Sequence, residues 1–305
     1  MLSIITPAYN EEQMVPKTAQ TISKIISGAG IDYELLFVND GSKDRTWDLI
    51  CQEAAKNDRI RGISFSRNFG KESAIFAGLA ESKGDCVVVI DSDLQHPPEK
   101  IVEMYHLWEQ GYEIVEGVKR SRGRESEAHS LAARAFYHMI SEATGFDMSR
   151  DSDFKLLDRK AVNVLLNMRE KNAFFRALSS WIGFKTVQIE YDVRERELGE
   201  SKWSTRALFR YAFTNITSFT AAPMQVVTIL GVVMLVIALI LTIETLYMKI
   251  SGNAARGFTT VIIFQCFTSS IIMMSLGIIG YYISKIYEEV KGRPRYIISQ
   301  TTDKE

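Results

Sequence analysis

Three polar side chains at alternate positions follow directly after an apolar run near residue 90. The segment VVVIDSDLQHPPE spans Val87 to Glu99 and presents Asp91, Asp93 and Gln95 after four hydrophobic residues. Alternate residues of an extended chain share a face, so Asp91 and Asp93 are expected to point the same way just beyond a buried strand. Carboxylate and amide oxygens suit a hard divalent cation, Mg²⁺ or Mn²⁺, whose remaining ligands come from substrate phosphates. The alternative is an acidic turn in which Asp93 caps a helix that starts near Pro97.

Two earlier apolar runs end in the same way. One is followed by PAYNEE, Pro7 to Glu12, and the other by VNDGS, Val38 to Ser42. Each segment alone is weak evidence, because Asp and Gly are common turn formers. In a parallel sheet, however, ligands bind outside the carboxyl ends of the strands. The three polar segments together therefore predict one binding site at that edge.

Strands and helices alternate through the first hundred residues. Apolar runs predict strands at 2–8, 33–40, 60–66 and 85–93, and periodic patterns predict helices at 10–30, 44–57 and 71–84. Such alternation is typical of an α/β fold with a mainly parallel sheet covered on both faces. No G-x-G-x-x-G follows a strand and no Gly-Lys-Ser/Thr loop is present, so dinucleotide and P-loop folds are not supported.

The composition excludes some function classes. Lys plus Arg total 36 and Asp plus Glu total 37 in 305 residues, and the net charge of −1 argues against nucleic acid as the main partner. The three cysteines lie far apart and match no metal spacing, and Cys86 and Cys266 stand in apolar runs, as buried small hydrophobes do.

Two long apolar segments near the C-terminal end predict a transmembrane hairpin. Residues 225–248 contain Glu244 as their only ionisable side chain, and residues 259–284 contain none. Each exceeds the roughly 20 apolar residues that a membrane-crossing helix needs. The alternative, a pair of buried helices in a soluble bundle, is disfavoured by the length of both runs and their lack of charge.

Basic residues around the two spans predict their orientation. They precede the first span at Lys202, Arg206 and Arg210 and follow the second at Lys285, Lys291, Arg293 and Arg295. The short connection carries only Arg256, so both termini are expected on the cytoplasmic side, and the first residues do not read as a signal peptide. We therefore expect a cytoplasmic domain over 1–203, a membrane hairpin over 224–285 and a cytoplasmic tail over 286–305.

Residues 204–223 lie between the domain and the first span. Their apolar residues recur at helical spacing, with Arg206 and Arg210 one turn apart. We interpret them as an interfacial amphipathic helix that ends at Pro223, and an ordinary domain helix is the alternative.

The motifs in combination resemble those of inverting glycosyltransferases of the GT-A fold, specifically bacterial polyprenyl-phosphate glycosyltransferases related to dolichyl-phosphate mannose synthase. PAYNEE, VNDGSKDRT and SRNFGKESAIFAGLAESKGDCVVVIDSDLQHPPE carry the resemblance, which spans nearly the whole chain and includes the hairpin. It implies a GT-A domain that transfers a hexose with inversion from a nucleotide-sugar, a UDP-hexose or alternatively GDP-mannose, to polyprenyl (undecaprenyl) phosphate. The reaction would serve cell-envelope glycan modification at the cytoplasmic membrane.

The resemblance also implies roles for individual residues. The nucleotide would be held by Pro7, Tyr9, Glu11, Asp40 and Asp91, and the cation by Asp91, Asp93 and Gln95. The catalytic residues would be Asp153 and Asp93, and the donor and acceptor phosphates would be bound by Lys119, Arg122, Arg196, Ser201 and Lys202. A lipid phosphate is already an anion, so Asp153 is expected to orient a substrate or support the positive charge at the anomeric carbon rather than act as a base. Without the resemblance, Asp153 reads as a turn residue, and Arg196 and Lys202 read as a solvated or lipid-facing basic surface.

The chain departs from the family pattern at five positions. Lys119 and Lys155 stand where arginine is usual, His129 where lysine is usual, Ala133 where serine is common, and Ser152 where glycine is expected. Lysine keeps the charge of arginine but loses its bidentate geometry.

Two other functions fit parts of the pattern. A processive polysaccharide synthase shares the nucleotide-sugar motifs, but Q-x-x-R-W is missing here and two spans are too few for a polymer channel. A catalytically silent membrane scaffold is disfavoured by the intact Asp91, Asp93 and Gln95. Association into a homo-oligomer is left open.

Overall fold

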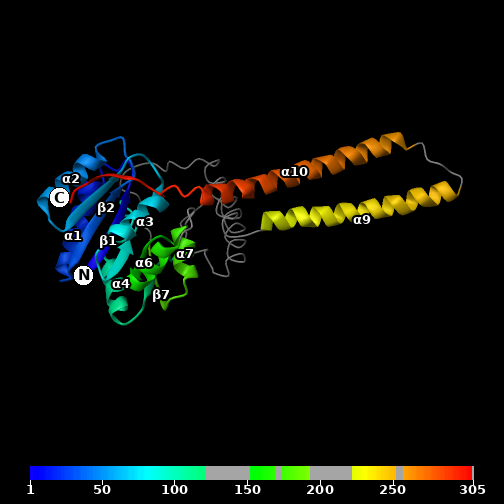
Figure 1. Ribbon diagram of the computed structural model, residues 1–305. Helices are drawn as coiled ribbons and strands as arrows, with labels where there is room; N and C mark the ends of the chain where they lie inside the picture. The colour runs from blue at the N-terminus through cyan, green and yellow to red at the C-terminus, as the bar shows by residue number, and fades with distance from the viewer. Residues whose placement is uncertain (121–151, 169–173, 193–221, 252–256, 304–305) are drawn as a thin grey trace. The chain divides into compact units, whose positions relative to one another are not determined.

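The computed structural model describes residues 1–120, 152–168, 174–192, 222–251 and 257–303 (Figure 1). The chain divides into two compact units, Met1–Phe209 with Arg293–Glu305, and Arg210–Gly292. The C-terminal residues thus belong to the first unit although the second unit precedes them in the sequence.

The first unit is built on one sheet. Its described strands are β1 (Leu2–Ala8), β2 (Tyr33–Asn39), β3 (Ile60–Phe65), β4 (Cys86–Val89), β5 (Ile114–Lys119), β6 (Lys155–Asp158), β7 (Thr186–Tyr191) and β8 (Ile298–Thr301). They lie in the order β7-β5-β6-β4-β1-β2-β3-β8. The strand β1 pairs in parallel with β2 and β4, β2 with β3, and β5 with β7, whereas β6 and β8 run antiparallel to their neighbours. The predicted α/β fold with a mainly parallel sheet is confirmed.

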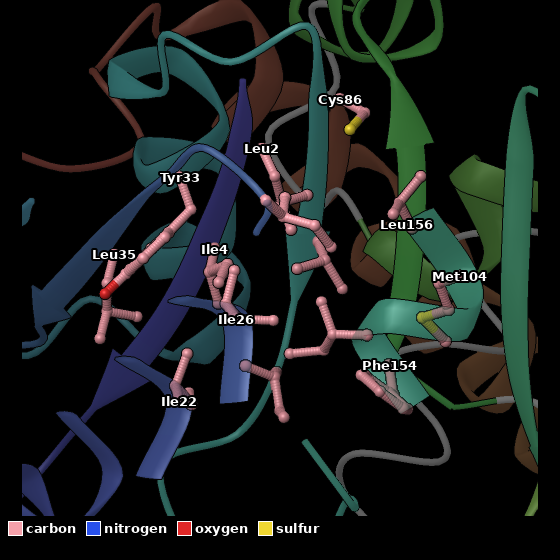
Figure 2. Packing of buried hydrophobic residues seen from close by; sticks show 14 of the residues in the cluster. Leu2, Ile4, Ile22, Ile26, Tyr33, Leu35, Cys86, Met104, Phe154 and Leu156 are labelled. Atoms are coloured by element: carbon pink, nitrogen blue, oxygen red, sulfur yellow. The ribbon is translucent and has the colours of Figure 1, made fainter. Parts of the chain in front are cut away.

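Helices cover both faces of this sheet. They are α1 (Val15–Gly28), α2 (Thr46–Lys56), α3 (Lys71–Glu81), α4 (Lys100–Glu109), α6 (Arg159–Asn167) and α7 (Phe175–Trp181). The apolar stripe of α1 packs through Ile22 and Ile26 against Leu2 and Ile4 of β1 (Figure 2). The next residue of β1 points to the opposite face, where α3 lies so close that a Cβ on Gly78 would clash with Ile5. The two-sided burial explains why the strands are apolar at nearly every position.

The chain around Asp91 differs from its predicted form. The strand β4 ends at Val89, and residues Ser92 to Leu94 form a turn in which Leu94 has a φ of 56°. The backbone N–H of Gln95 donates to Asp93 Oδ1 at 3.1 Å, and this local bond competes with continued strand pairing. The prediction that Asp91 and Asp93 share one face of an extended chain is therefore wrong. The helix α4 begins only at Lys100, so the capping alternative for Asp93 is wrong as well.

The second unit consists of two long helices in its described part. They are α9 (Ala222–Ile250) and α10 (Phe258–Val290), and each contains a stretch long and apolar enough to cross a membrane. These stretches are Val227–Glu244 and Phe267–Tyr287, and 6% and 0% of their residues are buried. Large apolar side chains such as Ile243 and Val261 are 70% and 65% exposed, as expected for lipid-facing helices and not for a soluble core. Pro223 lies in the first turn of α9, where a backbone N–H has no hydrogen-bond acceptor within the helix, so its missing N–H costs nothing.

Candidate functional site

The ends of β1 and β2 are joined by hydrogen bonds. Because β1 pairs in parallel with both β2 and β4, the carboxyl ends of the three strands meet at one edge of the sheet. The N–H of Asn10 donates to Ser42 Oγ, and the N–H of Lys43 donates to Asn10 Oδ1, each at 2.9 Å. Asn10 has a φ of 54°, a conformation that asparagine tolerates better than most residues. The structure thus brings the first two polar segments together as predicted.

The residues expected to hold a nucleotide differ in their exposure. Tyr9 is 38% exposed and is available to a ligand, whereas Pro7 is half-buried within β1. Glu11 precedes α1, and its N–H donates to the hydroxyl of Thr46 at 2.8 Å. The segment therefore presents Tyr9 on a backbone that is tied to the start of α2.

Asp40 is buried, and its carboxylate accepts hydrogen bonds from the backbone of the loop that precedes α3, Ser66 to Gly70 (the 66–70 loop). The N–H groups of Phe69 and Gly70 donate to its carboxylate at 2.6 and 2.9 Å. Burial raises the pKa of Asp40, and these two N–H groups partly oppose the rise. Gly41 lets the backbone of the 66–70 loop come close to Asp40. Its φ is 63°, and a Cβ there would lie 2.6 Å from the backbone nitrogen of Asn68. In this arrangement Asp40 organises the loop beside the predicted nucleotide edge.

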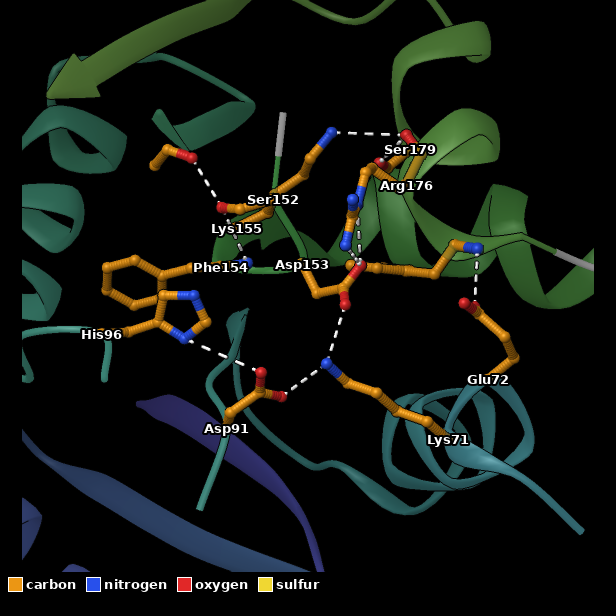
Figure 3. Close-up of polar contacts among 12 residues, drawn as sticks. Lys71, Glu72, Asp91, His96, Ser152, Asp153, Phe154, Lys155, Arg176 and Ser179 are labelled. Carbon is orange, nitrogen blue, oxygen red and sulfur yellow. Dashed lines mark hydrogen bonds and ion pairs between the residues drawn. The ribbon is translucent and has the colours of Figure 1, made fainter. Parts of the chain in front are cut away.

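A lysine bridges two carboxylates at the centre of the site (Figure 3). Lys71 Nζ, at the start of α3, lies 2.7 Å from Asp91 Oδ1 and 2.8 Å from Asp153 Oδ2. Arg176 of α7 contacts the other oxygen of Asp153 at 3.1 Å. Four segments far apart in the sequence therefore meet through two cations and the carboxylate pair, Asp91 and Asp153.

The cations keep the carboxylate pair ionised. Burial by itself would raise the pKa of Asp153, but Lys71 and Arg176 outweigh it and hold that pKa well below its usual range. The same balance, with Lys71 as the main partner, lowers the pKa of Asp91. Burial would lower the pKa of Lys71, yet the two carboxylates raise it. Asp153 therefore holds no proton near neutral pH and is a poor general base.

Sequence reasoning did not single out Lys71 or Arg176. A lysine in the first turn of a helix opposes the helix dipole, and that unfavourable placement of Lys71 was the available signal. Arg176 lies in the FFRALSSWIGF segment, where nothing in the spacing distinguishes it from a surface arginine.

Glu72 connects the first turns of α3 and α7. Its Oε2 accepts the N–H of Phe175 at 2.8 Å. Burial raises the pKa of Glu72 to about 7, with a further contribution from the charge of Asp153. Glu72 is thus a group beside the site whose charge changes near neutral pH.

Three rings, those of His96, Phe154 and Tyr191, pack against one another next to Asp91. The ring of His96 stacks on Phe154 at 5.3 Å and meets Tyr191 edge-on at 5.4 Å. Burial lowers the pKa of His96, so the ring is neutral at pH 7. Its Nδ1 is 3.9 Å from Asp91 Oδ2, too far for a hydrogen bond, and has no hydrogen-bond partner among the described residues.

Lys155 points away from the carboxylate pair and lies fully buried beneath α7. Its Nζ is 2.8 Å from Glu116 Oε1 and 3.1 Å from Ser180 Oγ, and it also donates to the carbonyl of Arg176 at 3.4 Å. Gln188 donates to the second oxygen of Glu116 at 3.2 Å. Lys155 therefore holds the helix that carries Arg176.

Of the remaining residues that the sequence analysis named, two are described by the structure. Ser152, at the expected glycine position, donates to the carbonyl of Gly117 at 2.6 Å, and Lys119 ends β5 half-buried. Arg122, His129, Ala133, Arg196, Ser201 and Lys202 lie outside the described residues.

The chemistry of the polar edge fits a divalent cation that shares its ligands with a substrate. Asp91, Asp93 and Gln95 offer two carboxylates and an amide oxygen, which hard cations prefer. Asp91 already binds one cation, the ammonium of Lys71, through its Oδ1. In the described part of the chain, no group of three or more His, Cys, Asp or Glu side chains could hold a metal by itself.

Comparison with known proteins places the chain in a family. Residues 3–177 match the sequence model of the family described as Glycosyl transferase family 2. The uncharacterised glycosyltransferase YkcC of Bacillus subtilis is 38% identical over 301 residues, 98% of this chain and 93% of that protein. A prophage bactoprenol glucosyl transferase homolog of Escherichia coli is 34% identical over 304 residues, 98% of each chain.

Among solved structures, the chain is similar to glucosyl-3-phosphoglycerate synthase from Mycobacterium tuberculosis in complex with Mn²⁺, UDP-glucose and phosphoglyceric acid. That match is 20% identical, covers 72% of this chain and 79% of that chain, and has a TM-score of 0.48. The family assignment rests on the family match and on the full-length relatives: the chain belongs to glycosyl transferase family 2.

Proposed function

We propose that the protein transfers a hexose from a nucleotide-sugar to a polyprenyl phosphate at the cytoplasmic face of a membrane, with inversion. The observation that carries this proposal is the cation-bridged carboxylate pair at the carboxyl edge of the sheet, in a chain that also has two exposed apolar helices. The E. coli relative, named as a bactoprenol glucosyl transferase homolog, supports a lipid phosphate acceptor and makes UDP-glucose the first donor to test.

The donor would bind across the ends of β1, β2 and β4. Tyr9 is exposed beside that edge, and Asp40 acts on the nucleotide through the 66–70 loop that it fixes. Asp91, Asp93 and Gln95 would hold Mg²⁺ or Mn²⁺, which neutralises the charge of a leaving diphosphate when bound.

The reaction is a single displacement. An oxygen of the acceptor phosphate forms a bond to the anomeric carbon while the bond from that carbon to the diphosphate breaks, and the nucleoside diphosphate leaves with the electron pair. Attack from the opposite side inverts the anomeric configuration. No proton has to be removed from an ionised phosphate, which agrees with the low pKa of Asp153.

The charges of the site have separate tasks in this scheme. Asp153, ionised and held by Arg176, supports the positive charge that develops at the anomeric carbon. Lys71 lies between the carboxylates and supplies positive charge toward the departing diphosphate. We assign Lys119, Arg122, Arg196, Ser201 and Lys202 to the donor and acceptor phosphates.

The membrane arrangement follows from the acceptor. A lipid phosphate is presented at the bilayer surface, so residues 1–203 would work there as a cytoplasmic domain beside an interfacial helix over 204–223. The hairpin over 224–285 would anchor the domain, and the basic residues flanking the spans support a cytoplasmic location of both termini.

The test is transfer of radiolabelled sugar by the purified full-length protein to undecaprenyl phosphate. UDP-glucose, UDP-galactose, UDP-N-acetylglucosamine and GDP-mannose are supplied separately, with Mg²⁺, Mn²⁺ or chelator. We expect label in the organic phase with one donor and its loss with chelator. Label in a water-soluble polymer would favour a processive synthase, and no turnover with any donor would favour a silent scaffold.

Asp153→Asn is the companion variant. It keeps the size of the side chain and removes the charge, so turnover should fall far more than affinity for the nucleotide. An unchanged rate would remove Asp153 from the reacting centre.

A further inference from the structure

The segment that follows α10 in the sequence is built into the sheet of the first unit. The strand β8 pairs antiparallel with β3, with Ile63 opposite Thr301 and Phe65 opposite Ile298. Beyond β8, Thr302 exchanges two hydrogen bonds with Gly62, at 2.8 and 2.9 Å. The attachment is therefore specific in register.

An ion pair holds the far end of this strand. Arg61 donates to both carboxylate oxygens of Asp303 at 2.6 and 2.7 Å, and to Glu34 at 2.8 Å. The side chain of Arg61 is only 12% exposed. This end of the segment lies beside the start of β3, and within the described residues no hydrogen bond or ion pair joins Asp303 to the 66–70 loop.

The near end of the segment touches that loop directly. The N–H of Ser66 donates to the carbonyl of Ile297 at 3.0 Å. The ring of Tyr296 stacks on Phe65 at 5.1 Å with an interplanar angle of 13°, and Phe65 meets Phe69 edge-on at 5.7 Å. Phe69 is the residue whose N–H donates to Asp40. One chain of contacts thus runs from Tyr296 to the carboxylate beside the nucleotide edge.

A second contact chain leads to Lys71. The guanidinium of Arg295 lies 4.6 Å from the centre of the Phe76 ring on α3. The same guanidinium donates to the carbonyl of Met168, just after α6, at 2.7 Å. Because Lys71 is the first residue of α3, Arg295 braces the helix that presents the bridging cation.

We propose that Arg295 and Tyr296 are positioning residues for donor binding: they hold the 66–70 loop and α3 in the geometry that the nucleotide-sugar requires. The inference rests on the proposed function for the nature of the ligand. A purely structural role, closure of the β3 edge, would be served equally by the Arg61–Asp303 end of the segment, and this gives a matched control.

The experiment compares Tyr296→Ala, Tyr296→Phe and Asp303→Asn in the full-length protein. Three quantities are measured: hydrogen exchange of the amides of residues 66–70, the dissociation constants of UDP and GDP with Mn²⁺, and the melting temperature. Tyr296→Ala should speed exchange in the loop and weaken nucleotide binding about two- to tenfold, the range of one lost aromatic pair. Tyr296→Phe keeps the ring and should behave as the wild type.

Asp303→Asn should lower the melting temperature without changing loop exchange or nucleotide affinity. In transfer assays, Tyr296→Ala should raise the KM for the donor and leave kcat within about twofold, as loss of uniform binding does. The proposal is overturned if Tyr296→Ala and Asp303→Asn change only the melting temperature, or change loop exchange equally. If the wild type binds neither UDP nor GDP, the proposed function fails, and loop exchange still decides whether Tyr296 positions the loop.

Discussion

Lys71 makes a pair of neighbouring carboxylates tolerable in a half-buried site. Asp91 and Asp153 lie within 2.8 Å of the same ammonium, and Arg176 supplies a second positive charge to Asp153. Without these cations, burial and mutual repulsion would both favour protonation of the carboxylates. Lys71 and Arg176 thus keep both carboxyl groups ionised.

Replacement of Lys71 by methionine should expose this dependence. Loss of one preorganised charge at a reacting centre lowers kcat by about 10²- to 10³-fold. The pKa of Asp153 should also rise, so that activity falls off at acidic pH where the wild type is still fully active. Steady-state rates between pH 5 and 8 measure both effects. Lys71→Arg keeps the charge and is the control, and a methionine variant with the wild-type rate and pH profile would contradict the role.

Glu72 should make the stability of the first unit depend on pH. Its pKa is about 7 in the folded protein against 4.5 for the free side chain, so folding favours the protonated form. This contribution is complete below pH 4.5 and is lost as the pH rises through 7. Glu72→Gln stays neutral at every pH. A rise of the pKa from 4.5 to about 7 corresponds to about 3 kcal/mol, so the melting temperature of Glu72→Gln should match that of the wild type at pH 4.5 and exceed it above pH 7 by roughly 6–12 °C.

The control for this measurement is Glu103→Gln, which changes an exposed carboxylate on α4. It should follow the wild type across the same pH range. A constant offset between Glu72→Gln and the wild type at all pH values would show that Glu72 does not titrate in this window.

At the level of elements, α7 depends on a buried ion pair beneath it. Lys155 and Glu116 lie under α7, and Lys155 also binds a hydroxyl and a carbonyl of that helix. Orientation of Arg176 toward Asp153 is therefore coupled to a charge pair on β5 and β6. The ammonium of Lys155 fits among Glu116, Ser180 and the Arg176 carbonyl.

Lys155→Met should destabilise the first unit by about 3–5 kcal/mol, because it leaves the buried carboxylate of Glu116 without a positively charged partner. The double variant Lys155→Met with Glu116→Leu should recover most of this loss, since no uncompensated charge remains. Denaturant unfolding of the detergent-solubilised protein provides the comparison. Equal stability of the single and double variants would mean that the pair contributes only packing.

The sequence predicted the elements better than their ends and their long-range partners. The hydrophobic pattern located β1 to β4 and α1 to α3, because the strands are apolar at nearly every position and each helix has a regular buried face. It placed Asp91 and Asp93 on a strand, because a hydrogen bond from the Gln95 N–H to the Asp93 carboxylate cannot be detected in the hydrophobic pattern. Strand β8 was missed for another reason: its partner β3 is more than 230 residues away, and four residues carry little periodic signal.

At the scale of the whole molecule, the two long apolar helices indicate that the chain associates with a membrane. The described residues of α9 and α10 are mostly exposed and apolar, while those of the first unit surround one buried core. Burial of such helices in a bilayer is strongly favourable, at about 25 cal/mol per Å² of apolar surface.

Labelling of one introduced cysteine at a time, in whole cells, tests the predicted orientation. Ser251→Cys lies just after α9, and Ser299→Cys lies in β8. A membrane-impermeant maleimide should modify the first from outside intact cells and the second only after the cells are opened. The parent protein, with its native cysteines, is the control, and the reverse pattern would place the first unit outside.

Strand β3 is synthesised early, yet its outer neighbour β8 lies beyond both α9 and α10 in the sequence. Every nascent chain therefore carries an unpaired sheet edge until the ribosome has passed the hairpin. Such an edge pairs readily with other chains. Translation of α9 and α10 thus precedes the final pairing of the sheet, so a chain arrested between these two helices would leave the ribosome with a 66–70 loop that the segment around β8 does not yet support.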